Sequence, residues 1–319
     1  MLRTVLLFLL ALGFCTSAFA EYPDRPIRLI LPYTPGGGAD IVGRPLAAEL
    51  GKQLGVSVIV ENKGGASGNI AMSYVAHAPA DGYTIILPLT AQVAVNPTLY
   101  RHLPYDPIND FAPITVVGRA AYFLLVNPKL PVHTLQEFIT LAKNNPGKFS
   151  YASSGIGSGL HLSMELFKSM AGVDMVHIPY KGGSEEYAEL LADRVQVMFG
   201  GVGGAKQWIE NGSMRVLAVS TEQRSRVLPN VPTFAEAGVP GFESDVWYAL
   251  LAPKGTPAPI VAKLHDAVVA ALNSPSLQKT FHDNGIETIG STPDQLTALI
   301  KTDTVKWADV IKRAKVPQQ

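Results

Sequence analysis

The chain has 319 residues, of which 47% are hydrophobic and 16% charged, and its 26 basic and 26 acidic residues leave no net charge. This composition is that of a folded protein large enough for two domains, and it excludes an intrinsically disordered chain. The balanced charge also excludes the basic surface that nucleic-acid-binding proteins use, so we expect no nucleic-acid partner.

Residues 1–20 have the pattern of a cleaved export signal. A positive N-terminus precedes the apolar segment Val5–Phe14, which is too short to span a bilayer, and the small-residue motif Ala18–Ala20 follows. We expect cleavage after Ala20. The only cysteine, Cys15, lies within this segment, so the exported chain is expected to have no disulfide and to depend on its core for stability.

The region around Tyr33 predicts a strand, a glycine turn and a helix in direct succession. The apolar run from Ile27 ends at Tyr33, then come Gly36–Gly38, and from Asp40 apolar residues recur at helical spacing to Leu50. Such a turn leaves backbone N–H groups open at the positive end of a helix, where glycine lets a ligand approach closely. The turn is a candidate anion site, although a simple tight connection would have the same sequence.

The same order of strand, Pro-Tyr, Gly-Gly and helix occurs again about half a chain later. Here Tyr180 precedes Gly182 and Gly183, and a helix is expected to begin near Ser184. The repetition predicts two similar α/β halves, each with one glycine loop. Two such loops on opposite walls of a cleft would hold the two ends of one ligand.

The remaining pattern alternates strands with helices, which predicts an α/β fold. We expect the chain to cross between domains in the run Ile114–Val126, split near Gly118–Ala121, and to return through Val246–Ala252. A capping-box pattern at Thr134 starts one helix, and a second helix is expected at 205–211, after a glycine cluster. Further strands are expected at 57–60, 84–87, 150–152, 195–199 and 216–220, and further helices through about 77 and 171, at 257–273, from 274 and from 292.

Seven segments, in family order across the exported chain, resemble the periplasmic solute receptors of tripartite tricarboxylate transporters, the Bug receptor family. They are PYTPGGGADIVGR, ENKGGASGNIA with APADGYTI, VNPTLYRHLPYDPINDFAPI, SSGIGSGLHLSMELF, IPYKGGSEEYAELL, RVLPNVPTFAEAGVPGFE and LLAPKGTPAPIVAKL. The resemblance implies a two-domain α/β clamshell of the periplasmic-binding-protein type (Venus flytrap, type II-like) with a hinge of crossing strands. We place domain 1 at residues 21–120 and 248–319, and domain 2 at residues 121–247.

The resemblance also implies the function. We expect a periplasmic receptor that closes over one small carboxylate and delivers it to the membrane permease subunits of a transporter, acting as a monomer with no cofactor, metal or catalytic residue. The ligand-binding residues carried over from the family's loops are Tyr33, Gly36, Gly37, Gly38, Asp40, Thr90, Ser153, Ser154, Gly157, Ser158, His161, Tyr180, Lys181 and Gly182.

Two stretches depart from the family pattern. The turn Gly200–Gly204 is rich in glycine where the family carries bulkier or polar residues, which would enlarge the cleft. The acidic stretch Glu243–Asp245 precedes the return strand and could place a carboxylate that favours an amine on the ligand. Within the carried-over set, Asp40 also fits a purely structural helix-start residue and Lys181 a solvated loop lysine.

Other functions fit parts of the same sequence. Ser154 and Ser158 lack the GxSxG elbow, but a secreted hydrolase that pairs Ser158 with a histidine is the enzymatic alternative. A sensory receptor that presents its ligand to a membrane kinase would use the same cleft as a transport receptor. His161 and Glu165 lie four residues apart on one expected helix, and they would form a metal site only with a third ligand.

Overall fold

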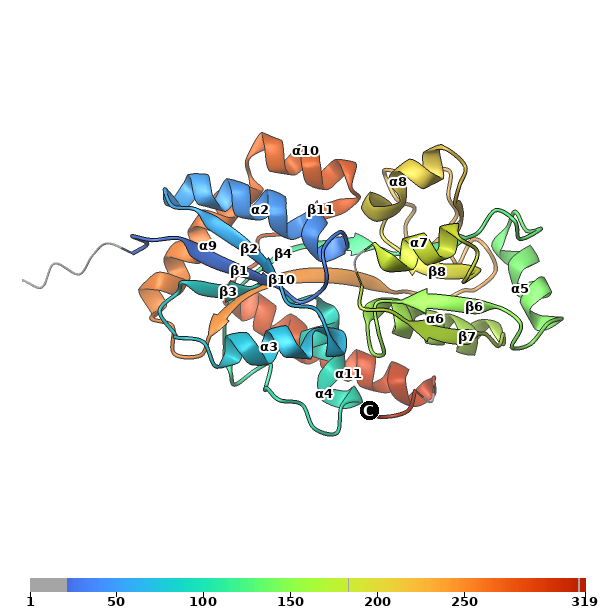
Figure 1. Cartoon of the computed structure of the whole chain (residues 1–319), viewed down its shortest axis with the longest axis horizontal. Helices are drawn as coiled ribbons and strands as arrows, with labels where there is room; N and C mark the ends of the chain where they lie inside the picture. The colour runs from blue at the N-terminus through green and yellow to red at the C-terminus, as the bar shows by residue number, and fades with distance from the viewer. Residues whose placement is uncertain (1–21, 183, 315) are drawn as a thin grey trace, which may run out of the picture.

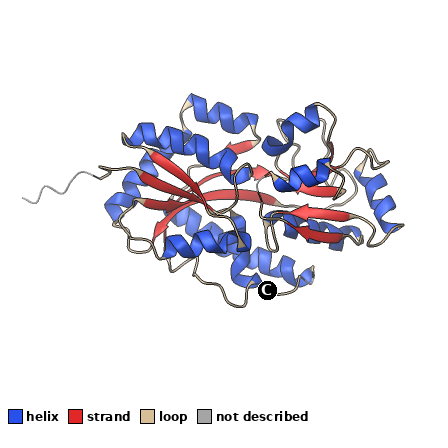
Figure 2. Cartoon of the chain, in the orientation of Figure 1, coloured by secondary structure: helices blue, strands red, loops and turns tan. Residues whose placement is uncertain are grey.

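The computed structural model describes residues 22–182, 184–314 and 316–319, so the expected leader and its cleavage site lie outside the described residues. Within these ranges the chain forms two β-sheets side by side along the long axis of the molecule, each packed between helices (Figures 1 and 2). No helix in the described part of the chain combines the length and apolar character needed to cross a bilayer.

The first sheet contains six strands in the order β11-β4-β10-β3-β1-β2. Strands β1, β2 and β3 are parallel, whereas β10 runs antiparallel to β3 and β4, and β11 is antiparallel to β4. The strands are β1 (Ile27–Leu31), β2 (Val58–Asn62), β3 (Thr84–Ile86), β4 (Phe111–Ala121), β10 (Asp245–Pro253) and β11 (Ile286–Thr288). The accompanying helices are α2 (Gly38–Leu54), α3 (Asn69–Ala76), α4 (Asn96–Leu99), α9 (Ala258–Leu272), α10 (Pro275–Asp283) and α11 (Pro293–Arg313), with a 3₁₀ turn η1 (Ala66–Gly68) and a π-helical segment η2 (Ala91–Val95).

The second sheet contains five strands in the order β7-β6-β8-β5-β9. Strands β6, β7 and β8 are parallel, and β5 is antiparallel to both β8 and β9. The strands are β5 (Phe123–Val126), β6 (Ser150–Ser153), β7 (Val176–Pro179), β8 (Val197–Gly200) and β9 (Arg215–Val219). The helices of this half are α5 (Leu135–Lys143), α6 (Gly159–Ala171), α7 (Glu185–Leu191) and α8 (Val202–Glu210).

The sequence signals at the helix ends act as expected. Thr134 caps α5 by accepting a hydrogen bond from the amide of Glu137, and Thr292 and Gln295 form a complete capping box at α11.

Strands β3, β5 and β8 are buried along their whole length, because helices or neighbouring strands cover both faces of each sheet. Continuous apolar runs, rather than alternating ones, therefore mark these central strands.

Two connections join the sheets, and one serine holds them together. β4 continues through Tyr122 directly into β5, and the return passes from Ser220 to Ser244 at the start of β10. The Ser220 hydroxyl accepts a hydrogen bond from the Tyr122 amide at 2.9 Å and donates one to the Ser244 carbonyl. The hydroxyl of Ser163 on α6 lies 2.6 Å from that of Ser244. This small serine cluster ties the two connections to each other and to α6.

Three details differ from the sequence-based expectation. The break between the crossing strands falls at Tyr122. Gly118 lies inside β4, and it is a glycine because the neighbouring strand β11, which was not expected, passes too close for a side chain. Helix α8 begins at Val202, so the glycine cluster forms its first turn rather than a preceding loop. The predicted domain boundaries stay a prediction, although β10 already belongs to the first sheet from Asp245 onward.

Gly118→Val should destabilise the protein by about 1–3 kcal/mol. A Cβ at this position would lie 2.6 Å from the Glu287 carbonyl oxygen, so β11 would have to move away from β4. Urea denaturation measures the loss. Gly201→Ser is the control, because a Cβ there meets no heavy atom within 4 Å and serine is a good helix N-cap. Equal stability of both variants would contradict this explanation of Gly118.

Candidate functional site

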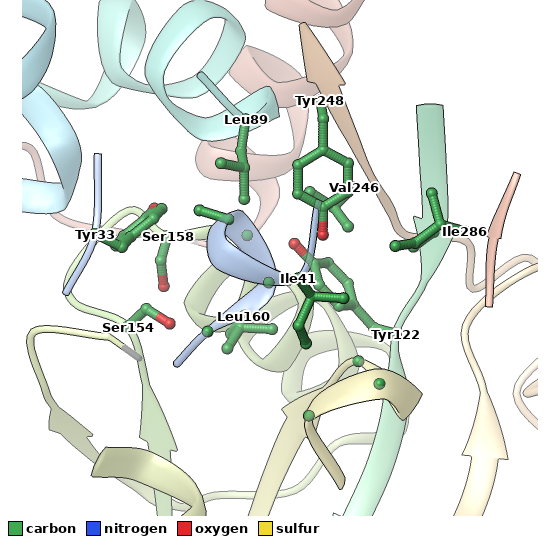
Figure 3. Close-up of a pocket in the computed structure, with 18 of the residues that line it drawn as sticks. Tyr33, Ile41, Leu89, Tyr122, Ser154, Ser158, Leu160, Val246, Tyr248 and Ile286 are labelled. Carbon is green, nitrogen blue, oxygen red and sulfur yellow. The ribbon is translucent and has the colours of Figure 1, made fainter. Parts of the chain in front are cut away.

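A cavity lies where the two sheets meet, and both halves of the molecule contribute to its wall (Figure 3). Residues from α2, β4, β10, α6, α7 and α8 line it. The space open to the centres of water molecules is about 80 Å³. That is room for roughly five to eight waters, or for one small organic molecule in their place.

The N-terminus of α2 faces this cavity through Gly37, Gly38 and Ala39. Gly37 is the N-cap and has no side chain, and its carbonyl oxygen accepts the amides of Asp40 and Ile41 at 3.0 and 3.2 Å. Among the described residues, no acceptor lies within hydrogen-bonding distance of the amides of Gly38 and Ala39. Two N–H groups at the positive end of a 17-residue helix are thus open to a ligand.

The N-terminus of α6 reaches the cavity from the second half of the molecule. Ser158 is its N-cap, and the serine hydroxyl accepts the amide of His161 at 3.3 Å. The amides of Gly159 and Leu160, which both line the cavity, have no acceptor within the described part of the chain. This helix of 13 residues therefore offers a second pair of N–H groups.

The third helix that begins at the cavity is α8. Its N-cap Gly201 and the first-turn residues Gly203 and Gly204 line the wall, and no side chain caps the helix. Gly204 allows the ring of Tyr187 to pack closely, since a Cβ there would lie 2.6 Å from the tyrosine hydroxyl. The glycine cluster thus brings the backbone itself to the surface of the cavity.

Four tyrosines supply the other polar groups of the wall, namely Tyr33, Tyr122, Tyr187 and Tyr248. Burial raises the pKa of each phenol, so all four are neutral hydroxyls at physiological pH. Figure 3 shows the hydroxyls of Tyr122 and Tyr248 turned toward each other inside the cavity. The apolar wall comprises Ile41, Leu89, Leu160, Val246 and Ile286. No lysine, arginine or histidine occurs among the lining residues of the described chain.

The structure brings five of the sequence-predicted residues to this cavity: Tyr33, Gly37, Gly38, Ser154 and Ser158. Two others, Tyr180 and Lys181, line a neighbouring opening together with Tyr33 and Ser154. The remaining seven do not line the cavity and instead support its wall: Gly36, Asp40, Thr90, Ser153, Gly157, His161 and Gly182.

Asp40 holds the first glycine turn in shape. Its buried carboxylate accepts hydrogen bonds from the Gly36 amide at 3.2 Å, from Asn62 at 3.0 Å and from Arg44 at 2.6 Å. Gly36 has φ of +92°, a conformation that residues with a Cβ rarely adopt. With its oxygens engaged in this way, Asp40 acts as a helix-start residue.

The second glycine loop lies directly against the first. The Thr34 hydroxyl donates to the Gly182 carbonyl oxygen at 2.7 Å, and a Cβ at Gly182 would lie 2.9 Å from the Tyr33 ring. The predicted facing of the two loops is thus present in the structure, but Gly182 joins the two walls rather than lining the cavity. Gly183 lies outside the described residues, and the Lys181 side chain is exposed.

Thr90 and Gly157 stabilise neighbouring backbone. The Thr90 hydroxyl accepts the amide of Trp247 at 3.0 Å, which holds η2 against β10. The Gly157 amide donates to Nδ1 of His161 at 3.1 Å, and a Cβ at Gly157 would lie 2.1 Å from Leu99. Both residues therefore position the loops around the cavity.

A stack of buried rings supports the loop that precedes α6. The rings of His161 and His177 lie 4.2 Å apart, and Tyr151 stacks on His177 at 4.7 Å. The Ser153 hydroxyl lies 2.6 Å from Nε2 of His177, but Ser153 is fully buried and away from the cavity, so this serine–histidine pair has no access to a substrate. Across the described residues, no group of three histidine, cysteine or acidic side chains could hold a metal.

Sequence reasoning missed four polar residues of the wall. Tyr122 and Tyr248 lie at the crossings between the sheets, which were expected to form the hinge, and Glu186 and Tyr187 follow the second glycine loop but were not among the predicted ligand-binding residues. Of the two departures from the family pattern, only the glycine cluster lies at the cavity. Asp245 pairs instead with Arg119 at 3.3 Å and does not line the cavity. The one signal in the sequence was an acidic residue, Glu186, at the expected start of a helix directly after a glycine loop.

Comparisons with known proteins agree with this architecture. The family described as the tripartite tricarboxylate transporter family receptor matches residues 42–316. Protein BugT of Bordetella pertussis is 35% identical over 314 residues, covering 98% of this chain and 96% of BugT. An R. palustris protein solved with adipate has a TM-score of 0.90 at 39% identity, with 92% of this chain and 99% of that chain covered. MatC from Rhodopseudomonas palustris with bound malate has a TM-score of 0.87 at 31% identity, with 91% and 100% covered. The periplasmic binding protein BugD has a TM-score of 0.90 at 35% identity, with 93% and 100% covered.

The buried histidines predict a fold that is sensitive to acid. Burial, aided by nearby Lys168, lowers the pKa of His161 to about 4, and burial together with the His161 ring lowers that of His177 to about 3. In the unfolded chain both would protonate near pH 6.5. Their contribution to stability is thus complete above pH 6.5 and is lost as the pH falls toward the folded-state values, by on the order of 3 kcal/mol for each histidine at pH 4.

Urea denaturation between pH 4 and 7.5 measures this loss. His177→Asn should show a shallower decline of the free energy of unfolding with falling pH than the wild type. His133→Asn is the matched control, because His133 is exposed and should leave the decline unchanged. The same decline in all three proteins would contradict the role of the histidine pair.

Proposed function

Because the chain belongs to the tripartite tricarboxylate transporter receptor family, we propose that it is a non-catalytic periplasmic receptor for one small carboxylate. The ligand lies in the cavity between the two halves, at the N-termini of α2, α6 and α8, and is delivered to a membrane permease. Family membership confirms the resemblance that the seven sequence segments carry. Export through the N-terminal leader and a monomeric state complete the proposal.

The observation that carries the proposal is the convergence of three helix N-termini on a cavity whose described lining has no basic side chain. A hydrogen bond to a charged group contributes about 1.5–3 kcal/mol, and a helix dipole adds roughly 0.3–1 kcal/mol. Three or four such contacts, less the cost of association, reach about −8 kcal/mol, which corresponds to micromolar affinity. Backbone amides thus suffice to hold a carboxylate.

The ligand class is consistent with the solved relatives. Two of the similar structures were solved with adipate and with malate, both small dicarboxylates. The cavity of this chain is small and its wall is largely apolar, which suits a short acid better than a large one. The glycine-rich start of α8 leaves open space in the cavity at Gly201.

Release and capture require the two halves to separate. Within the described residues, three hydrogen bonds cross the cleft at its rim. The Thr34 hydroxyl donates to the Gly182 carbonyl oxygen at 2.7 Å, and the hydroxyls of Ser67 and Tyr100 donate to the Ile156 carbonyl oxygen at 2.8 and 3.4 Å. These contacts are few, so ligand contacts to both halves would add substantially to the stability of the closed form. We place the bend at the crossings held by Ser220.

Isothermal titration calorimetry against mono-, di- and tricarboxylates, with each acid also assayed for turnover, tests the proposal. We expect saturable micromolar binding of at least one acid, one ligand per chain, and no product. Conversion of any bound acid, or binding of none, would overturn the receptor function.

Gly201→Thr should weaken carboxylate affinity at least tenfold while the stability of the protein is kept. Threonine at a helix N-cap is about as favourable as glycine, but its hydroxyl would accept the first-turn amides of α8 and its methyl group would enter the cavity. Calorimetry and urea denaturation measure the two effects separately.

Ser274→Thr provides the control for this change. It adds a methyl group at the N-cap of α10, which lies outside the cavity, and should leave the affinity unchanged. Wild-type affinity of Gly201→Thr would show that the first turn of α8 does not contact the ligand.

A further inference from the structure

The cavity contains one ionisable carboxyl group, that of Glu186 in the first turn of α7. Glu186 is only 2% exposed, although glutamate is rarely so deeply buried without a partner. The chain has placed an acid in a cavity that is otherwise built to attract anions. This combination calls for an explanation in terms of the ligand.

One oxygen of Glu186 is fixed and the other is free. The Ser154 hydroxyl donates a hydrogen bond to Oε1 at 2.6 Å, so the carboxyl group is held in one orientation. Oε2 is buried and has no hydrogen-bond partner in the described structure. An unsatisfied buried polar atom destabilises the protein, and this cost is recovered if a ligand supplies the missing partner.

In the described part of the chain, no cation forms an ion pair with Glu186. The titratable groups that interact with it electrostatically are Tyr33, Tyr187 and its neighbour Glu185, none of which is a cation. Burial raises the pKa of Glu186, and the hydrogen bond from Ser154 opposes this shift. A second carboxylate placed beside Glu186 would add to the unfavourable charge.

We propose that Glu186 determines ligand specificity by accepting a hydrogen bond at Oε2 from a hydroxyl or ammonium group of the bound carboxylate. The inference rests on the proposed receptor function and narrows its ligand class to hydroxy and amino acids. The ligand's carboxylate lies at the helix N-termini, and its donor group lies at Glu186. An unsubstituted acid of the same length leaves Oε2 unpaired.

Three acids with the same four-carbon skeleton test the proposal: succinate, L-malate and L-aspartate. A parallel pair of longer acids, adipate and 2-aminoadipate, covers the case in which the four-carbon acids are too short. In each set we expect the wild type to bind a donor-bearing acid at least tenfold more tightly than the unsubstituted one, as measured by calorimetry. Glu186→Ala should remove that preference mainly by weakening the donor-bearing acid.

Glu185→Gln is the matched control. Glu185 lies beside Glu186 in the first turn of α7 but is exposed, so this variant changes the same helix end without touching the cavity. It should keep the wild-type preference. Urea denaturation of both variants shows that any loss of affinity does not come from unfolding.

The outcomes separate the two proposals. If no acid binds to the wild type, the receptor function fails and the inference with it. If acids bind but Glu186→Ala keeps the wild-type preference, only the inference is overturned. Calorimetry in two buffers of different ionisation enthalpy counts protons taken up. Tight binding of succinate or adipate with uptake of one proton, abolished in Glu186→Ala, would also overturn the inference, because Glu186 would then be a donor.

Discussion

Backbone N–H groups that the fold leaves without acceptors are the constraint on which this structure depends. Helices α2, α6 and α8 all begin at one cavity, and two of them start with glycines that cannot cap their own amides. A buried donor without an acceptor is costly, so the closed cavity favours an anion or water as its occupant. The absence of basic side chains from the described wall makes the backbone the main source of positive potential.

The cavity exists only because two sheets share two connecting strands. β4 and β10 pair along most of their length and carry Tyr122 and Tyr248 from the first sheet to the cavity. The serine cluster of Ser163, Ser220 and Ser244 fixes the crossing to α6, whose N-terminus forms part of the opposite wall. The same contacts that join the two sheets therefore also position the two walls of the cavity.

Glu186 adds a hydrogen-bond acceptor to a cavity where the helix ends supply only hydrogen-bond donors. Three helix N-termini attract negative charge, while a single buried carboxyl group, oriented by Ser154, presents an oxygen without a partner. An acid that carries a hydroxyl or ammonium group satisfies both features at once. In the proposed site, the helix N-termini would bind the carboxylate and Glu186 would distinguish one carboxylate from another.

Local sequence determined the elements and the first wall of the site. Apolar runs, caps at Thr134 and Thr292 and the glycine turn at Gly36–Gly38 act over a few residues, so their patterns predicted the α/β alternation and the opening of α2. Tertiary packing decided the rest, because a pattern within one element does not reveal which distant element it meets. Only the folded chain shows that Gly182 contacts Tyr33, that His161 stacks on His177 instead of lining the cavity, and that Glu186 faces the cavity.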